Sequence, residues 1–259
     1  MRPAIGDLFH EDTLIRRGVL SFVGVDEVGR GAWAGPIVAG AAVLNPVVYA
    51  DRSLLSAVDD SKRLKPGRRE QLVTQIASLA TIALGWVDPA TIDAIGIAHA
   101  THQAMTAAIG ALSASSPDAM ICGNGWFGRR VSGDAITPTF VLVDGYRING
   151  TSLPQQAIVR GDRSCLCIAA ASIVAKVARD HFMSDVGDCY PDFKFADHKG
   201  YGTLTHFRAL RAHGLTPFHR RSFQPMKYLA GRNDYVRGLL PPPASGRGTI
   251  HQTVQLDFL

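Results

Sequence analysis

Three short apolar segments of this sequence are each followed by acidic residues, and this pattern restricts the folds that the chain can adopt. The segments and their acids are Phe22–Val25 with Asp26 and Glu27, Thr139–Val143 with Asp144, and Ala157–Val159 with Asp162. Runs of this length and composition predict β-strands. Because carboxylates are costly to bury, we expect the strand ends to deliver all of these acids toward one edge of a sheet.

The remaining patterns predict an α/β fold built on a mixed sheet. The glycine-dense turn after Glu27 leads into a second strand, Ile37–Leu44, and a third is expected at Ala80–Val87. Helical spacing is found at Gly67–Leu79 (beginning near Pro66), from Pro89 to Leu112, at Cys167–His181, and at Leu204–His213 before the capping Gly214. Antiparallel strands followed by alternating strands and helices favour a central mixed sheet flanked by helices.

Length and composition predict one globular body with tails. The chain has 259 residues, of which 46% are hydrophobic. We expect an N-terminal extension at 1–20, a catalytic body at 21–228 that includes C-terminal helices, and a flexible proline- and glycine-rich tail at 229–259. The segment 122–136 (CGNGWFGRRVSGDAI) is predicted to be a mobile surface insertion. Its Trp126, Phe127, Arg129 and Arg130 could contact nucleic acid, but a surface loop without a role is favoured.

Charge and cysteine usage indicate a cytoplasmic protein. The formal net charge is +5 and the pI about 9.2, which suits a polyanionic partner but is shared by many proteins that have none. The four cysteines match neither a zinc ribbon nor a redox motif, so free thiols are expected. The charged N-terminus is unlike a signal peptide, and no apolar run is long enough to cross a membrane. We expect a monomer with no membrane association.

The acids suggest a site for divalent metal ions. Adjacent strand residues point to opposite faces, so Asp26 and Glu27 serve one site only if the strand ends or twists there. Taken alone, this dipeptide is more typical of a solvated surface turn. Together with Asp144 and Asp162 it forms the oxygen-ligand set that Mg²⁺ prefers. Two such ions would support an in-line phosphodiester displacement.

Several separated blocks resemble prokaryotic ribonuclease HII, the type 2 ribonucleases H, from about residue 22 to residue 227. The blocks are GVDEVGRG (24–31), DDSKRL (59–64), VLVDGYR (141–147), VRGD (159–162), AAASIVAKVARD (169–180), HKGYGT (198–203) and HRRSF (219–223). The resemblance implies a ribonuclease H-like fold with a C-terminal helical part. It also implies that Asp26, Glu27, Asp144 and Asp162 are catalytic and bind two Mg²⁺ or Mn²⁺ ions, and that cleavage leaves 3′-hydroxyl and 5′-phosphate ends.

The same resemblance implies residues that bind the substrate. Gly29, Arg30 and Gly31 match the element that recognises a 2′-hydroxyl, and Tyr201 matches a tyrosine that packs on the deoxyribose at an RNA–DNA junction. Lys62, Ser172 and Lys176 match polar positions near the groove that binds the nucleic-acid backbone, although a solvated Lys176 is an equal alternative.

Other ionisable residues are interpreted as structural. Asp180 is expected to form an ion pair or a cap. His99 and His102 are expected to be surface or core residues, because no further metal-ligand motif accompanies them. His198 is expected to orient the loop that carries Tyr201.

The C-terminal peptide QLDFL resembles the short peptides by which bacterial replication and repair proteins dock on the sliding clamp. Gln255, Leu256, Phe258 and Leu259 are its candidate contacts, since spaced apolar side chains at a free end can anchor in a groove. The order Phe-Leu departs from the commoner Leu-Phe ending.

The leading functional hypothesis is a metal-dependent endonuclease that hydrolyses the RNA strand of RNA–DNA hybrids and cuts 5′ to single ribonucleotides in duplex DNA. One alternative is another ribonuclease H-like nuclease that acts on DNA. The other is an inactive hybrid-binding adaptor, which would have little reason to retain all four costly carboxylates.

Overall fold

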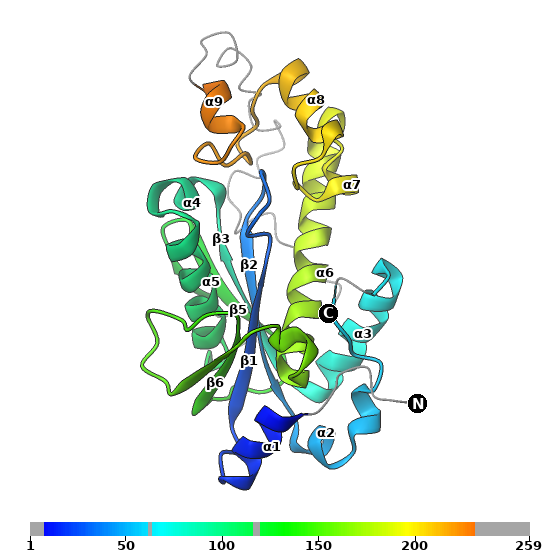
Figure 1. Cartoon of the computed structure of the whole chain (residues 1–259), viewed down its shortest axis with the longest axis vertical. Helices are drawn as coiled ribbons and strands as arrows, with labels where there is room; N and C mark the ends of the chain where they lie inside the picture. Colours follow the sequence, from blue (N-terminus) through cyan, green and yellow to red (C-terminus); the bar gives the residue numbers. More distant parts are fainter. Residues whose placement is uncertain (1–7, 62–63, 116–119, 231–259) are drawn as a thin grey trace.

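The computed structural model describes residues 8–61, 64–115 and 120–230 of the chain. Within these residues a seven-stranded sheet with the order β4-β5-β3-β2-β1-β6-β7 forms the centre of the molecule (Figure 1). The strands are β1 (Phe22–Val28), β2 (Ile37–Leu44), β3 (Ala80–Val87), β4 (Met120–Gly123), β5 (Trp126–Ser132), β6 (Phe140–Asp144) and β7 (Gln155–Ile158).

Both strand directions occur in this sheet, as the sequence predicted. Neighbouring strands from β4 through β5, β3 and β2 to β1 run antiparallel. The pairs β1–β6 and β6–β7 run parallel. The parallel pairs matter for function because they place the ends of β1, β6 and β7 at the same edge of the sheet.

Helices cover both faces of the sheet. The α-helices are α1 (Phe9–Arg16), α2 (Pro46–Ala50), α3 (Pro66–Leu79), α4 (Pro89–Ile95), α5 (Ile97–Ala111), α6 (Leu166–Cys189), α7 (Phe195–His198), α8 (Leu204–His213) and α9 (Met226–Ala230), and the 3₁₀ helices are η1 (Arg52–Leu55), η2 (Gly161–Arg163) and η3 (Pro191–Phe193). Figure 1 shows α5 on one face and α6 on the other, with α7 and α8 near the C-terminal end of α6.

Glycines inside the strands allow both long helices to pack closely on the sheet. A Cβ atom on Gly40 of β2 would lie 2.3 Å from the carbonyl oxygen of Ala171 in α6, and one on Gly85 of β3 would lie 2.0 Å from that of Ala104 in α5. Real side chains do not tolerate such distances, so glycine is required at these two positions. Close contact with the backbone also explains why α6 is rich in alanine.

The N-terminal segment contributes a charged residue to the core. Glu11 of α1 is fully buried, and its carboxylate accepts hydrogen bonds from the backbone amides of Leu166 (3.1 Å) and Cys167 (2.9 Å). These amides belong to the first turn of α6, which has no acceptor within its own helix. Burial raises the pKa of Glu11, and the two amide hydrogen bonds oppose that rise. Glu11 therefore acts as the N-terminal cap of α6 from a distant part of the sequence.

Two helix boundaries differ from the sequence-based prediction. The stretch from Pro89 to Leu112 is two helices, because Gly96 adopts φ +80° and interrupts the helix between α4 and α5. Glycine takes this left-handed conformation without the steric cost that other residues incur. Helix α6 is longer than expected and continues to Cys189.

The prediction of a mobile insertion at 122–136 was wrong. Most of this segment forms the end of β4 and all of β5, and β5 pairs with β3 in the sheet. Phe127 is buried and stacks on Trp86, with ring centroids 5.8 Å apart, while the buried Arg130 donates hydrogen bonds to the carbonyls of Ala114 and Gly133. Gly128 accommodates the backbone of α5, so the glycine pattern reflects close packing instead of mobility.

No helix among the described residues is long and apolar enough to cross a membrane.

Candidate active site

Asp26 and Asp144 lie side by side because β1 and β6 are parallel neighbours. The register pairs Val25 of β1 with Val143 of β6, and the next residue on each strand is an aspartate. Gly24 and Leu142, two residues earlier on each strand, face α6, so Asp26 and Asp144 follow the same side of the sheet.

Burial and like charge make Asp26 an unfavourable place for a negative charge. Its side chain is 5% exposed, and its pKa is raised well above the ordinary value. Desolvation is the largest cause, followed by the charges of Glu27 and Asp144. Hydrogen bonds from the Ser172 hydroxyl and from the Glu27 amide, at 2.7 Å from Oδ1, only partly oppose this rise. A cation bound at this position would stabilise the ionised form.

Glu27 projects to the other face of the sheet. Strand β1 does not end at Glu27, since Glu27 still pairs with Ala39 and Val28 with Val38. The alternation along the strand therefore directs Glu27 toward α5, while Asp26 faces α6. Nη1 of Arg30 lies 3.9 Å from Glu27 Oε1. The two neighbouring acids thus approach the edge of the sheet from opposite faces.

Asp162 reaches the same region from η2. The backbone amide of Gly161 donates a hydrogen bond to Asp144 Oδ1 at 2.6 Å, which holds the Gly161–Arg163 turn beside the end of β6. The Asp162 side chain is 4% exposed. The following Arg163 forms an ion pair with the buried Asp60, with Nη2 and Oδ2 2.9 Å apart. This pair fixes the turn from its other end.

The four carboxylates at this edge suit a hard divalent cation, but their side chains do not converge on a single point. Asp26, Glu27, Asp144 and Asp162 offer only carboxylate oxygens, the ligands that Mg²⁺ and Mn²⁺ accept. In the part of the chain that the structure describes, no three histidine, cysteine, aspartate or glutamate side chains form a ready metal-ligand group. One oxygen of Asp144 is already engaged by the Gly161 amide.

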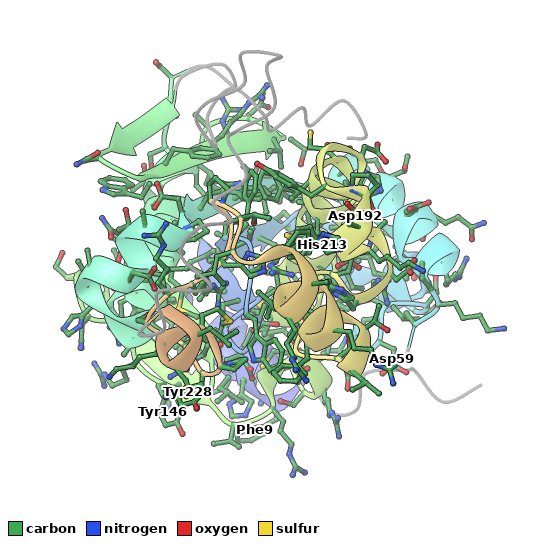
Figure 2. The ribbon with its side chains drawn as sticks, turned by 90° about the horizontal axis from the view of Figure 1, so that it is seen from above. Phe9, Asp59, Tyr146, Asp192, His213 and Tyr228 are labelled. Carbon is green, nitrogen blue, oxygen red and sulfur yellow. The ribbon has the colours of Figure 1, made fainter. Side chains whose placement is uncertain are left out.

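A pocket of about 390 Å³ opens beside these acids on the α5 face. One wall comes from β1, β6 and the residues that follow them, and the other from α5. The lining residues are Glu27, Arg30, Asp144, Gly145 and Tyr146 on the first wall and Ala98, Thr101, His102 and Met105 on the second. Tyr146, labelled in Figure 2, is 74% exposed at this pocket. Sequence analysis did not identify His102 or Tyr146 as site residues.

Two buried arginines hold the loop that carries Gly29, Arg30 and Gly31. Arg220 donates from Nη1 to the carbonyl of Arg30 and from Nε to that of Gly35, both at 3.0 Å. Arg179 of α6 donates to two further carbonyls of the same loop, at residues 34 and 36. Gly29 has φ +88°, and a Cβ there would lie 2.2 Å from Arg179 Nε. The loop is therefore shaped by donors outside it.

The loop that carries Tyr201 is joined to the Arg30 loop. The amides of Trp33 and Ala34 donate to the Gly200 carbonyl at 2.8 and 3.2 Å. Arg179 completes the connection by donating to the carbonyl of Lys199 at 2.9 Å. Its guanidinium carbon also lies 5.5 Å from the centre of the Tyr201 ring. Arg30 and Tyr201 are thus presented by two loops that form one hydrogen-bonded unit.

The candidate residues of α6 have structural partners as well. Ser172 is hydrogen-bonded to Ser61 at 3.0 Å and to Asp26. Lys176 Nζ lies 2.6 Å from Asp180, which also pairs with Arg69. The ion pair expected for Asp180 is therefore confirmed. Lys176 Nζ also lies 5.8 Å from the centre of the Tyr201 ring, so it remains next to the candidate substrate-binding surface.

Three histidines behind the Tyr201 loop form a network that sequence analysis missed. The amide of Thr216 donates to Nδ1 of His219 at 2.9 Å, and the Nε2 atoms of His219 and His206 are 3.0 Å apart. Nδ1 of His206 lies 3.0 Å from the Tyr201 carbonyl. These partners assign a neutral tautomer to each ring, in which His219 Nε2–H donates to His206 and His206 Nδ1–H donates to Tyr201.

The third ring, His198, stacks on His206 with centroids 4.5 Å apart. Its Nδ1 accepts a hydrogen bond from the Gly200 amide at 3.2 Å, which confirms the expected role of His198 in orienting this loop. Burial is the main reason that the pKa of His206 is lowered to about 4 and that of His219 to about 3.

Lys62 and the peptide with Gln255, Leu256, Phe258 and Leu259 lie outside the described residues.

Comparison with known proteins identifies one family. The sequence profile named Ribonuclease HII matches residues 23–226. Ribonuclease HII of Chloroflexus aggregans is 46% identical over 229 residues, which cover 88% of this chain and 98% of that protein.

Solved structures of the same fold are also similar. In the complex of PCNA with RNase HII from Archaeoglobus fulgidus, the match has a TM-score of 0.56 and 24% identity and covers 74% of this chain and 87% of that one. The structure of Bst-RNase HIII in complex with Mn²⁺ gives a TM-score of 0.55 at 18% identity, covering 81% and 68%. At these identities the likeness establishes the fold, and the expected ribonuclease H-like architecture is confirmed.

Proposed function

The chain belongs to the ribonuclease HII family, and from this premise we propose that it hydrolyses the RNA strand of RNA–DNA hybrids and cuts 5′ to single ribonucleotides embedded in duplex DNA. Family membership makes it a nuclease of the ribonuclease H type. The choice of these substrates, the use of two metal ions and the formation of 3′-hydroxyl and 5′-phosphate ends are the proposed part.

The observation that carries this proposal is the pairing of Asp26 with Asp144 at the ends of two parallel strands. Both side chains are carboxylates at one sheet edge, and Asp26 has a raised pKa because it is buried and because Glu27 and Asp144 add negative charge nearby. Such an arrangement costs stability unless cations offset it, so it favours a functional role over a structural one.

Asp26, Glu27, Asp144 and Asp162 would hold two Mg²⁺ or Mn²⁺ ions. When bound, these ions would stabilise the charge that develops on the phosphate during in-line displacement. The family resemblance makes Asp26 the central candidate among these ligands, and its buried position beside Glu27 and Asp144, whose charges raise its pKa, supports that role. The Mn²⁺ bound by Bst-RNase HIII, a protein of the same fold, is consistent with this assignment.

Recognition of the ribonucleotide would come from the two joined loops. The 2′-hydroxyl is a donor and an acceptor that DNA lacks, and the Gly29–Gly31 segment offers backbone groups that approach a ligand without side-chain obstruction. Tyr201 would pack against the neighbouring deoxyribose. The nucleic-acid backbone would be contacted by Ser172, Lys176 and Lys62. Contacts of serine and lysine to phosphates position the substrate but do not depend on its base sequence.

Cleavage of a duplex that contains one ribonucleotide tests the proposal. With Mg²⁺ or Mn²⁺ the wild-type chain should cut 5′ to the ribonucleotide and leave an all-DNA duplex intact. Asp144→Asn should lower the rate at least about a hundredfold, because it removes a metal ligand while the fold is retained. Asp192→Asn is the matched control, since Asp192 is exposed in η3 and is labelled in Figure 2 on the opposite side from Tyr146.

Three outcomes would contradict the proposal in different ways. Equal cleavage of the all-DNA duplex would favour the alternative of a DNA-directed nuclease. Binding of the hybrid without cleavage in either metal would favour the inactive adaptor. Wild-type activity in Asp144→Asn would show that Asp144 is not a catalytic residue.

We also propose that the C-terminal peptide docks on a sliding clamp. The complex of PCNA with RNase HII of Archaeoglobus fulgidus supports a clamp partner for this family. The clamp should be retained by the full chain and lost when the chain is truncated before Gln255, with ribonucleotide cleavage unchanged. Equal retention by both forms would exclude the peptide as the docking element.

A further inference from the structure

The α5 wall of the pocket contains a hydrogen-bond donor that the proposed mechanism does not use. His102 lines this pocket together with Glu27, Arg30 and Asp144. The backbone amide of Asn149 donates to His102 Nδ1 at 3.4 Å. Because Nδ1 acts as the acceptor, the neutral ring carries its hydrogen on Nε2. Desolvation, together with the charges of His99 and Arg30, lowers the pKa of His102 and so favours this neutral form.

The opposite wall indicates what such a donor would meet. Glu27, Arg30 and Asp144 line that wall, so carboxylates and a guanidinium lie at the edge of the pocket. A nucleotide whose phosphate is drawn to this edge would present further phosphate and sugar oxygens to the remaining donors. The volume of about 390 Å³ falls at the lower end of the range of small-ligand pockets, which suits a single nucleotide unit.

The pocket lies on the other face of the sheet from Tyr201. Tyr201 packs beside Lys176 and Arg179, both of which belong to α6. The pocket is closed by α5, and Figure 1 shows these two helices on opposite faces. A substrate strand that crosses the acids at the sheet edge would therefore have one flank near Tyr201 and the other flank in the pocket.

We propose that His102 contacts the substrate directly, with Nε2–H donating to a backbone oxygen of the nucleotide that lies on the opposite side of the scissile phosphate from Tyr201. This inference rests on the proposed function and assigns a binding role to the α5 face of the active site.

Four variants separate this role from a structural one. His102→Ala removes both ring nitrogens. His102→Asn keeps a side-chain oxygen near Nδ1, which can still accept from Asn149, but has no donor at the place of Nε2. His102→Gln places an amide donor near Nε2 and loses the contact to Asn149. His99→Ala is the matched control, because His99 is exposed one turn away on α5, where its Nδ1 lies 3.1 Å from the carbonyl oxygen of Ile95 in the preceding helix.

Steady-state cleavage of a duplex with one ribonucleotide provides the readout. We expect kcat/KM to fall about tenfold in His102→Ala and in His102→Asn, mainly through KM, because a hydrogen bond to a charged phosphate oxygen is lost. His102→Gln should recover most of this loss, and His99→Ala should match the wild type. Recovery by asparagine but not by glutamine would show that His102 only supports the Asn149 loop, and would overturn the proposal.

Two shortened duplexes test the side on which His102 acts. Each lacks the base pairs on one flank of the ribonucleotide. The His102→Ala defect should disappear with one duplex and the Tyr201→Ala defect with the other. Loss of both defects with the same duplex would overturn the assignment to opposite flanks.

The failure of this inference can be distinguished from the failure of the proposed function. A wild-type chain that cuts no ribonucleotide substrate contradicts both. A wild-type chain that cuts normally, with His102→Ala indistinguishable from His99→Ala, contradicts only the role of His102.

Discussion

Nη1 of Arg220 donates a hydrogen bond to the carbonyl oxygen of Arg30 at 3.0 Å, although the two residues are 190 positions apart in the sequence. The same guanidinium donates through Nε to Gly35. A planar guanidinium can serve both carbonyls at once, whereas the single ammonium group of lysine cannot reproduce that geometry.

We therefore predict that Arg220→Lys impairs the Arg30 loop despite preserving the charge. Cleavage at a single ribonucleotide should fall about tenfold or more, and the free energy of unfolding should drop by about 1–3 kcal/mol, because a buried carbonyl loses its donor. Arg221→Lys, at an exposed position next to it, should change neither quantity. Wild-type kinetics in a folded Arg220→Lys chain would show that the loop holds its shape without this contact.

The pair of buried histidines predicts that the protein loses stability in mild acid. The folded-state pKa values of His206 and His219 are lowered to about 4 and about 3, while both residues in the unfolded chain titrate near 6.5. The two states bind equal numbers of protons above that pH, and the unfolded state binds more as the pH falls below it. Between pH 7.5 and 5, each histidine should cost about 2 kcal/mol.

Urea unfolding at these two pH values measures the effect. His219→Asn should show a smaller loss between pH 7.5 and 5, although it starts from a lower stability. His213→Asn, which alters an exposed residue at the end of α8, should keep the wild-type dependence. A pH dependence that is unchanged in His219→Asn would contradict this explanation.

Asp26→Asn should stabilise the metal-free protein while abolishing cleavage. The folded-state pKa of Asp26 is raised, so its ionised form destabilises the fold at neutral pH, and the neutral amide removes that cost. Thermal unfolding with a chelator should give a higher Tm for Asp26→Asn than for the wild type, and added Mn²⁺ should raise its Tm less.

Asp180→Asn provides the contrasting case. Asp180 is paired with Lys176 and Arg69, so its removal should lower the Tm. If both variants changed the Tm in the same direction, the different charge environments assigned to these two aspartates would be wrong.

Glu11→Ala should destabilise the chain by about 3 kcal/mol, because the first turn of α6 loses the acceptor for two buried amides. Glu11→Gln should cost less, since an amide oxygen can still accept one of these hydrogen bonds. Asp12→Asn should cost under about 1 kcal/mol, because the ion pair of Asp12 with Arg52 is partly exposed to solvent. Chemical denaturation of the three variants at one pH compares them directly.

The sequence allowed the sheet to be predicted where local patterns are strong. Strands β2 (Ile37–Leu44) and β3 (Ala80–Val87) were predicted with the observed bounds. Both are nearly uninterrupted apolar runs, which is the pattern expected of a strand that is buried on both faces of a sheet. Asp144, which was predicted to follow the apolar run Thr139–Val143, is the last residue of β6. The face that each acid takes was not predicted, because it depends on whether β1 continues past Glu27, and the pairing with β2 decides that.

The features that sequence analysis missed depend on partners that are distant in the chain. Strand β5 was not predicted because its glycines are typical of a loop. In the structure Gly128 is required by close contact with the backbone of α5, which the sequence does not reveal. His206 and His219 carry no motif, and their roles follow from facing each other across a turn of the C-terminal part. His102 was interpreted as a surface or core residue because no further metal-ligand motif accompanies it and His99, yet the fold places it in the pocket that Glu27 and Asp144 also line.

The hydrogen bonds that the amides of Trp33 and Ala34 donate to Gly200 join the two loops that present Arg30 and Tyr201 into one rim. Two loops that are joined in this way would not close on a duplex independently of each other. The adjustment needed for a good fit would then have to come from the nucleic acid, whose backbone bends or unstacks at a cost that depends on its local composition. A stiff duplex and a flexible duplex that carry the same ribonucleotide would then be cleaved at different rates. This difference would arise even if the protein contacts none of the bases that distinguish the two duplexes.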